Sequence, residues 1–247
     1  MAKGARKISE SGYYHVTARG NGRQLIFEDD GDRHLLLQKL EDAFARQNIV
    51  TIAWCLMDNH FHLAVFDQNQ TLSVAFQAAL SSYARIYNRK TGHSGHLFEA
   101  RFWSEPIESD AQLLETVRYI HDNPQKAGVA FASRYLWSSY GQYARGEQGL
   151  ADTQIVLDLA GGRSGFIAFT ESVLPIWDPM EEEMEKMSRD PRMVEVLDWH
   201  GIENPAKIKT LPKPVRDALL RDLKDRGFHI RELERLTGIG RGVIQRL

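Results

Sequence analysis

The sequence predicts an α+β fold: an antiparallel sheet with helices on one face, then a helical connector and a small C-terminal helix-turn-helix. Three observations predict this. Strand-like and helix-like patterns alternate through the first 145 residues. The length of 247 residues suits one large domain and one small domain. Residues 206–247 are helical in pattern and rich in lysine and arginine.

Each element of the first 145 residues has a pattern that predicts it. Runs of aromatic and β-branched residues predict strands, and apolar residues three or four positions apart predict amphipathic helices. Asp58 and Asn59 predict a tight turn between two strands. The last helix is capped by Asp110 and must end near Pro124, because the residue before proline is pushed out of the α region. In order, we expect a strand at 12–19, a helix at 32–47, strands at 49–57 and 60–66, a helix at 72–87, an extended segment at 97–107 and the last helix from 110.

This order of elements forms two split β-α-β halves, which is the ferredoxin-like arrangement. In that arrangement the helices cover one face of the antiparallel sheet and leave the other face available for a ligand. We therefore assign residues 1–145 to one large domain, residues 146–205 to a helical and acidic connector, and residues 206–247 to a small helix-turn-helix-like domain.

The two C-terminal parts differ in charge although the formal net charge of the chain is only −2. Residues 171–199 carry nine acidic and three basic side chains, whereas residues 205–247 carry eleven basic and five acidic ones. A basic tail of this kind suggests contact with phosphate.

Short helices are expected in both C-terminal parts, at 152–159 and 165–173 in the connector and at 215–225 and 230–236 in the tail. A glycine-bearing turn at 237–240 and a further helix from Arg241 complete the outline of a helix-turn-helix. The alternative is a small helical cap on the first domain.

The composition is that of an ordinary globular protein, with 43% hydrophobic and 26% charged residues. The single cysteine, Cys55, excludes an internal disulfide framework. The N-terminal segment lacks the apolar stretch of a signal peptide, and no apolar run reaches membrane-spanning length. We expect a cytoplasmic protein with no membrane partner.

His60 and His62 are the most informative pair in the sequence. They lie one residue apart in a predicted strand, so both imidazoles project from the same face. Two exposed polar positions would be the ordinary interpretation of such a pair. Here the flanking residues are strongly apolar, which predicts a buried strand, and burying a polar side chain costs free energy unless it has a bonding partner. Imidazole is a common ligand of divalent ions, and two neutral ligands leave the ion a strong Lewis acid for a phosphate oxygen.

Tyr119 is a candidate nucleophile in the last predicted helix. Asn123 lies four residues later and shares its face, so the amide oxygen could complete a metal site beside the phenol. His121 is offset by two positions and is not expected on that face. Packing in the core is the ordinary role of such a tyrosine. Because a phenol has a pKa near 10, it needs a metal and nearby basic groups to act as a nucleophile.

Five ordered segments give the chain a resemblance to a known family, the HUH single-tyrosine transposases, in particular the branch of REP-associated (IS200-like) tyrosine transposases. A His-x-His pair alone would be weak, but the matching segments span residues 13–140 in the family's order and spacing. They read YHVTARGN at 14–21, MDNHFHL at 57–63, GHLFEARF at 95–102, YIHDNPQKAG at 119–128 and WSSY at 137–140.

The resemblance implies a ferredoxin-like nuclease that uses Mg²⁺ or Mn²⁺. It implies that His60 and His62 hold the ion, that Asn123 occupies the position of a third ligand, and that Tyr119 is the nucleophile. Single-stranded DNA would be cut to leave a 5′-phosphotyrosine and a free 3′-hydroxyl. The chain departs from the family's usual pattern at Asp58, where proline is common, and after the tyrosine at Asp122 and Gln125.

Other basic and aromatic residues are candidates for holding DNA. Arg19, Asn21 and Arg23 lie in and beside a glycine-rich loop that could grip phosphates. The run from Lys90 to Arg101, with Phe98, Phe102 and Trp103, mixes charge with stacking surfaces, as single-strand or hairpin binders do. Core packing is the ordinary role for these aromatics, above all for Phe102. Arg241 is the candidate in the C-terminal helices.

The leading hypothesis is a metal-dependent endonuclease and strand transferase, a transposase that cleaves and rejoins hairpin-forming repeat DNA. One alternative is a catalytically inactive DNA-binding regulator on the same fold. Another is a phosphodiesterase that works through a metal-bound water, with Tyr119 only packing. The expected partners are single-stranded or hairpin DNA, and duplex DNA at the C-terminal helices. The sequence leaves open Mg²⁺ against Mn²⁺, and a monomer against a homodimer.

Overall fold

A computed structural model describes residues 6–99, 101–171, 190–202 and 204–247. The chain divides into two compact units, residues 1–176 and residues 177–247, each of which is described by itself. The acidic stretch at 172–189, which holds most of the predicted connector's charge and the end of its second helix, lies outside the described residues. None of the helices in the described part is long and apolar enough to cross a membrane.

The first unit contains a four-stranded antiparallel sheet in the order β2-β3-β1-β4. The strands are β1 (Tyr13–Arg19), β2 (Val50–Met57), β3 (His60–Phe66) and β4 (Trp103–Ile107). β2 and β3 form the predicted hairpin, with Asp58 and Asn59 at its turn. β4 is shorter than the extended segment expected at 97–107, because only its last five residues pair with β1. A short 3₁₀ turn, η1 (Asn21–Arg23), follows β1.

Two long helices pack on one face of this sheet. They are α1 (Asp30–Gln47) and α2 (Leu72–Thr91), and both confirm the predicted helical patterns. The side chain of Asp29 caps α1 by accepting a hydrogen bond from the Asp32 backbone nitrogen at 3.1 Å. Alternate residues of the strands point into this layer and form a continuous apolar core with the helices. Its strand residues include Val16, Leu56, Phe61 and Leu63.

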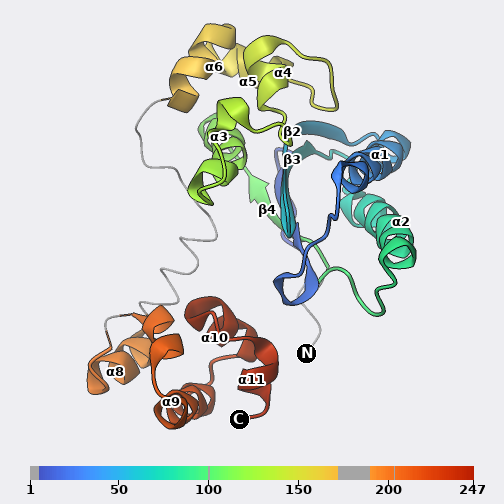
Figure 1. Cartoon of the computed structure of the whole chain (residues 1–247). Coiled ribbons are helices and arrows are strands. Elements are labelled where there is room, and N and C mark those ends of the chain that lie inside the picture. The colour runs from blue at the N-terminus through green and yellow to red at the C-terminus, as the bar shows by residue number, and fades with distance from the viewer. Residues whose placement is uncertain (1–5, 100, 172–189, 203) are drawn as a thin grey trace. The chain divides into compact units, whose positions relative to one another are not determined.

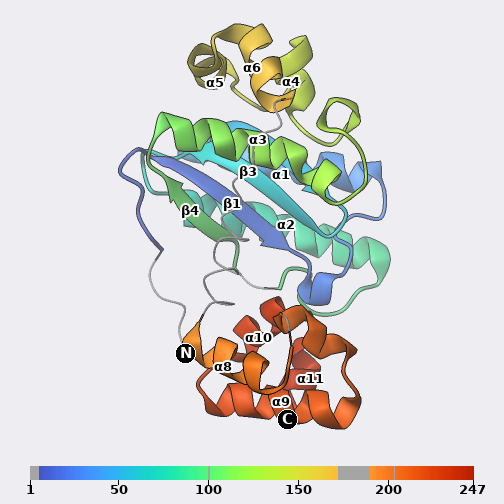
Figure 2. The same cartoon turned by 90° about the vertical axis from the view of Figure 1, so that its left-hand side faces the viewer.

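A third helix, α3 (Asp110–Lys126), packs on the opposite face of the sheet, as Figure 1 shows. The expectation that all helices cover one face was therefore wrong. Small side chains at Ala53, Cys55 and Ala64 let α3 approach the strands closely, and its apolar side chains pack against them. Figure 2 shows α3 lying across the sheet in front of β3.

The two ends of α3 also differ in detail from expectation. Ser109, and not Asp110, is the cap, and its hydroxyl accepts a hydrogen bond from the Gln112 backbone nitrogen at 3.2 Å. The helix continues past Pro124 to Lys126, so the proline lies in its last turn. Because proline has no backbone N–H, the helix lacks the one hydrogen bond that position 124 would otherwise donate.

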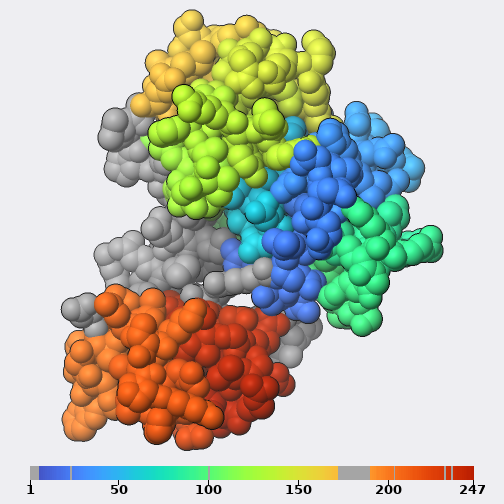
Figure 3. Space-filling view, viewed as in Figure 1, coloured from blue at the N-terminus to red at the C-terminus, as the bar shows by residue number. Residues whose placement is uncertain are grey.

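Three short helices follow in the same unit: α4 (Tyr140–Arg145), α5 (Gln154–Ala160) and α6 (Gly162–Glu171), after a 3₁₀ turn η2 (Ala132–Arg134). Val156 of α5 and Phe166 of α6 are buried in one cluster with α3. Residues 154–171, which we expected to lie within the connector at 146–205, thus share the core of the first unit. In Figure 3, atoms in the cyan of β3 remain visible between α3 and the blue N-terminal segments, so α3 leaves part of this face uncovered.

The second unit is a small helical bundle. Its helices are α8 (Pro191–Trp199), α9 (Lys213–Asp225), α10 (Ile230–Thr237) and α11 (Arg241–Gln245), with a 3₁₀ helix η3 (Pro205–Thr210). They enclose their own apolar core, which includes Leu220, Leu233 and Ile244. The predicted helices and the turn before Arg241 are confirmed. α10, a short glycine-bearing turn and α11 follow one another at the C-terminal end of this unit.

Candidate functional site

The pairing of β1 with β3 brings two polar rows together on the face that α3 partly covers. Thr17 lies opposite His62, and Arg19 lies opposite His60. Because neighbouring side chains alternate, the polar residues of both strands point away from the α1 and α2 layer. The ring centroids of His60 and His62 are 5.1 Å apart with planes at 85°. The prediction that the two imidazoles project together is confirmed.

Hydrogen bonds at the Nδ1 atoms orient both imidazoles. His60 Nδ1 is 2.7 Å from the side-chain oxygen of Asn59, which can only accept, so Nδ1 carries the proton. His62 Nδ1 is 3.0 Å from the Thr17 hydroxyl and 3.1 Å from His15 Nε2. With Nδ1 engaged in each ring, Nε2 is the atom that can donate a lone pair to a metal ion.

The surroundings keep both rings neutral. Burial lowers the pKa of His60 to about 4, and the charge of Arg19 adds to this while Asp58 opposes it. Burial lowers the pKa of His62 well below its ordinary value, with smaller effects from His60, His15, Arg19 and Lys126. A neutral imidazole is the form that binds a metal, so the site is in its ligating state near neutral pH.

Tyr119 reaches this site from α3. Its ring centroid lies 5.4 Å from that of His62 and 5.5 Å from that of His15, and its side chain is buried. Asn123, one turn later, donates a hydrogen bond from its amide nitrogen to the Tyr119 backbone carbonyl at 2.8 Å. That bond leaves the amide oxygen as the atom of Asn123 that suits a cation. The structure thus brings the Tyr119 ring to His62 and its neighbour His60, with Asn123 one turn further along the same helix.

These donors fit a divalent cation. Among the described residues, no group of three or more His, Cys, Asp and Glu side chains could hold a metal ion. A cation here would instead depend on two imidazole nitrogens and a neutral amide oxygen, with no protein carboxylate. Nitrogen and oxygen donors suit Mn²⁺ and Mg²⁺, and the missing negative charge leaves phosphate oxygens of DNA as natural additional ligands.

His121 points away from the site, as its position on the helix predicts. Its Nε2 is 2.8 Å from the Ser139 hydroxyl, and rings of Tyr140, Tyr143 and Phe166 surround it. Burial lowers the pKa of His121 to about 3. The residue therefore belongs to the packing between α3 and α4–α6.

This burial predicts a pH dependence of stability. Because the unfolded histidine titrates near 6.5 and the folded one near 3, the unfolded state gains a proton first as the pH falls. Stability from His121 is complete above pH 6.5 and declines below it, by about 3 kcal/mol at pH 4. Urea unfolding of His121→Gln should therefore show a flatter decline than the wild type between pH 6.5 and 4. Parallel declines would contradict this.

The two acidic departures from the family's pattern are both engaged by arginines. Asp122 Oδ2 lies 3.7 Å from Nε of the buried Arg118, on the neighbouring face of α3. Burial raises the pKa of Asp122 to about 6, although Arg118 and Lys126 oppose this. Asp58 binds Nη2 of Arg33 at 2.7 Å, which ties the β2–β3 turn to α1. The observed contacts of both carboxylates are thus with arginines and not with the candidate metal ligands.

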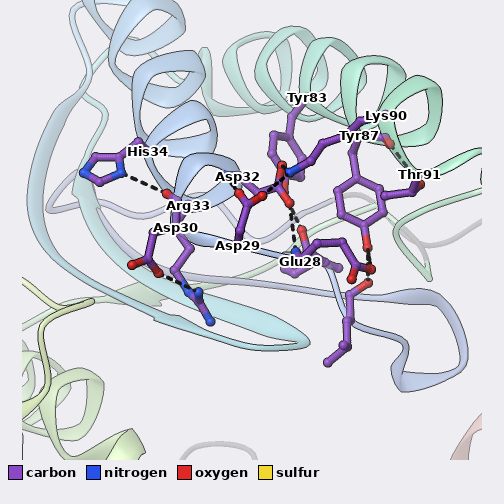
Figure 4. A network of polar contacts seen from close by, with 12 residues as sticks. Glu28, Asp29, Asp30, Asp32, Arg33, His34, Tyr83, Tyr87, Lys90 and Thr91 are labelled. Carbon is purple, nitrogen blue, oxygen red and sulfur yellow. Dashed lines mark hydrogen bonds and ion pairs between the residues drawn. The ribbon is translucent and has the colours of Figure 1, made fainter.

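A network of charged residues joins α1 to α2 on the far face of the sheet (Figure 4). Lys90 Nζ binds Asp29 Oδ2 and Asp32 Oδ1, both at 2.7 Å. The Tyr87 hydroxyl donates to Glu28 Oε1 at 2.9 Å. Lys90, which begins the basic run considered for DNA binding, is therefore part of a structural network.

The other DNA-binding candidates fall into different places. Arg19 lies beside His60, Asn21 is exposed in η1, and Arg101 is exposed before β4. The side chain of Arg23 lies outside what the structure describes. Arg241 is in the second unit and pairs with Glu234 at 2.9 Å.

The aromatic candidates divide as well. Phe102 is buried in the core and stacks near Phe76, with ring centroids 4.4 Å apart. Trp103 is partly exposed, and its ring centroid lies 5.6 Å from that of His15. Trp103 is therefore the aromatic of this run that lies at the site.

Sequence reasoning missed four residues of the site: His15, Thr17, Asn59 and Lys126. The signal for two of them was present, since polar residues at 15, 17 and 19 alternate with apolar ones on a strand. Lys126 lies on the same face of α3 as Tyr119, with Nζ 4.7 Å from the centre of its ring.

Comparison with known proteins agrees with this geometry. Residues 8–123 match the family described as "Transposase IS200 like", a stretch that ends at Asn123 and includes every first-unit site residue discussed above except Lys126. The chain is similar to the solved structure of a REP-associated tyrosine transposase bound to a REP hairpin, with a TM-score of 0.50 and 18% identity. That similarity covers 71% of this chain and 100% of the other, and it shows the fold. No curated protein matches this chain significantly.

Proposed function

This chain belongs, through residues 8–123, to the IS200-like transposase family of tyrosine DNA nucleases, and from that membership we propose its specific reaction. The protein is a metal-dependent endonuclease and strand transferase for single-stranded DNA. It cleaves and rejoins hairpin-forming repeats through a 5′-phosphotyrosine intermediate. The observation that carries this proposal is that the Tyr119 ring lies against His62, which with His60 forms a pair of neutral imidazoles.

His60 and His62, through Nε2, and Asn123, through its amide oxygen, would hold Mg²⁺ or Mn²⁺. When bound, the ion supplies Lewis acidity that withdraws charge from a phosphate oxygen. The protein's own part is orientation, because Asn59 and Thr17 hold the imidazoles by their other nitrogens.

Tyr119 attacks the phosphorus of the scissile phosphate. The bond from the phenolic oxygen to phosphorus forms as the bond from phosphorus to the 3′ oxygen breaks. The phenol loses its proton and the 3′ oxygen gains one, leaving a 5′-phosphotyrosine and a 3′-hydroxyl. One phosphate ester replaces another, so a 3′-hydroxyl can reverse the reaction without ATP.

Several basic and aromatic residues of the first unit supply the DNA contacts in this proposal. Arg19, Asn21, Arg23 and Arg101 bind phosphates, and Trp103 offers a stacking surface for a base. The second unit, with its α10–α11 outline, binds duplex DNA. Because Arg241 is paired with Glu234, its contact with DNA requires it to exchange or share that partner.

The test is capture of the covalent intermediate. The protein is incubated with Mn²⁺ and a pool of 5′-extended single-stranded hairpins labelled 3′ to possible cleavage sites, then denatured in detergent. We expect a labelled protein–DNA adduct that yields a phosphotyrosine on digestion, and sequencing of the attached DNA identifies the repeat. Cleavage with no adduct would support the hydrolytic phosphodiesterase, and binding without cleavage would support the inactive regulator.

Thr17 provides a prediction for metal binding alone. Thr17→Val removes the hydroxyl that orients His62 and should weaken Mn²⁺ binding about tenfold, measured by calorimetry without DNA. Thr51→Val is the matched control, because Thr51 is also a buried strand threonine but its hydroxyl has no hydrogen bond within the described residues. Equal Mn²⁺ affinity in the two variants would contradict the orienting role.

A further inference from the structure

Lys126 lies in the last turn of α3, seven residues after Tyr119. Residues seven apart on a helix share a face, so Tyr119, Asn123 and Lys126 form one stripe directed at the sheet. The ammonium nitrogen of Lys126 is 4.7 Å from the centre of the Tyr119 ring. The remainder of the Lys126 side chain is exposed, so it can meet a ligand from solvent.

The charge of Lys126 extends into the site and is not confined to its own helix. It is one of the causes that lower the pKa of His62, together with Arg19. It also lowers the pKa of Asp122, four residues earlier. Lys126, over the Tyr119 ring, and Arg19, opposite His60, thus place positive charge next to neutral imidazoles, and this arrangement suits a polyanionic backbone.

We propose that Lys126 is a catalytic residue of strand transfer, whose ammonium contacts the scissile phosphate while Tyr119 attacks it. The inference rests on the proposed function. A cation over the ring face stabilises the negative charge that develops as the phenol loses its proton. The same ammonium binds a non-bridging phosphate oxygen, on which charge also gathers. Lys126 gains and loses no proton in this role: the phenol proton still passes to the 3′ oxygen.

An ordinary explanation of Lys126 is a cation that favours a helix C-terminus. Arg46 controls for this, because it is also an exposed basic residue in the last turn of a helix, α1. α1 lies on the other face of the sheet from Tyr119. Arg46→Met and Lys126→Met thus remove the same charge from equivalent helix positions.

The experiment measures adduct formation in a single turnover, with full-length protein in excess over a labelled hairpin that the wild type cleaves in Mn²⁺. We expect Lys126→Met and Lys126→Gln to slow the adduct about 100-fold while DNA affinity falls less than about fivefold. Lys126→Arg should retain most of the rate, and Arg46→Met should match the wild type. Thermal unfolding identifies any variant that is misfolded, and the two neutral substitutions serve as replicates.

Three results would overturn the inference. Wild-type rates in Lys126→Met would exclude a catalytic contact while leaving the proposed function intact. An equal loss in Lys126→Met and Arg46→Met would assign the effect to the helix end. A loss of rate that saturating protein restores would make Lys126 a DNA anchor only. If the wild type forms no adduct with any hairpin of the pool, the proposed function fails, and the role of Lys126 fails with it.

Discussion

Tyr119→Phe is expected to abolish covalent attachment to DNA while leaving DNA binding within about threefold of the wild type. The substitution removes only the hydroxyl, so the ring contacts with His15 and His62 remain. Tyr119 is the phenol whose ring lies against that of His62. The rate of adduct formation should therefore fall by at least about 10⁴, the scale seen when a catalytic nucleophile is removed. Gel analysis of denatured protein with labelled DNA measures the adduct, and fluorescence anisotropy measures binding.

Tyr140→Phe is the matched control for this prediction. Tyr140 is also a buried tyrosine of the first unit, but it lies in α4 beside His121. This variant should form the adduct at the wild-type rate. A phosphotyrosine formed normally by Tyr119→Phe would refute the assignment of the nucleophile. Loss of DNA binding in that variant would mean that the phenol acts in recognition.

His60→Ala and His62→Ala are each expected to remove both metal binding and cleavage. The proposed metal site draws on two imidazoles and a neutral amide, so the loss of one imidazole leaves too few donors to hold a divalent ion. We expect Mn²⁺ affinity to fall beyond detection by calorimetry and adduct formation to fall at least about 1,000-fold. His62→Ala also removes the hydrogen bonds that the His62 ring makes with Thr17 and His15, so it should be the less stable of the two.

His34→Ala controls for the loss of an imidazole. His34 is exposed on α1, where its ring contacts Trp137. The His34→Ala variant should therefore bind Mn²⁺ and form the adduct like the wild type. Undiminished cleavage by His60→Ala or His62→Ala would disprove the ligand role of that residue. Normal Mn²⁺ binding by a variant that does not cleave DNA would instead give that histidine a role in the cleavage reaction and not in holding the metal.

Much of the first unit followed from local patterns. The alternation of apolar residues in β1, β2 and β3 sets which side chains share a face, and this period of two holds in any antiparallel sheet. Local geometry also places His60 and His62 on one face of their strand. In the same way, the helical period places Tyr119 and Asn123 on one face of α3. These features could be predicted because each depends on residues close together in the chain.

Other features depend on which surfaces meet, and no local pattern contains that information. The helix α3 has an apolar face that could pack on either side of the sheet. It packs on the side where Ala53, Cys55 and Ala64 lie together, and these three small residues come from two different strands. Val156 and Phe166 show ordinary helical spacing, yet their burial against α3 joins α5 and α6 to the first unit. A connector and an extension of a core look alike in sequence until their partner surface is known.

The sequence by itself determined the chemical groups of the site and their order along each strand and helix, because covalent spacing and backbone period are local. Only the tertiary structure decided that His15 and Thr17 hold His62 and that Lys126 lies over the Tyr119 ring. The first two contacts join β1 to β3, and the Tyr119 ring carries α3 to the same place, so all of them depend on how the whole core packs.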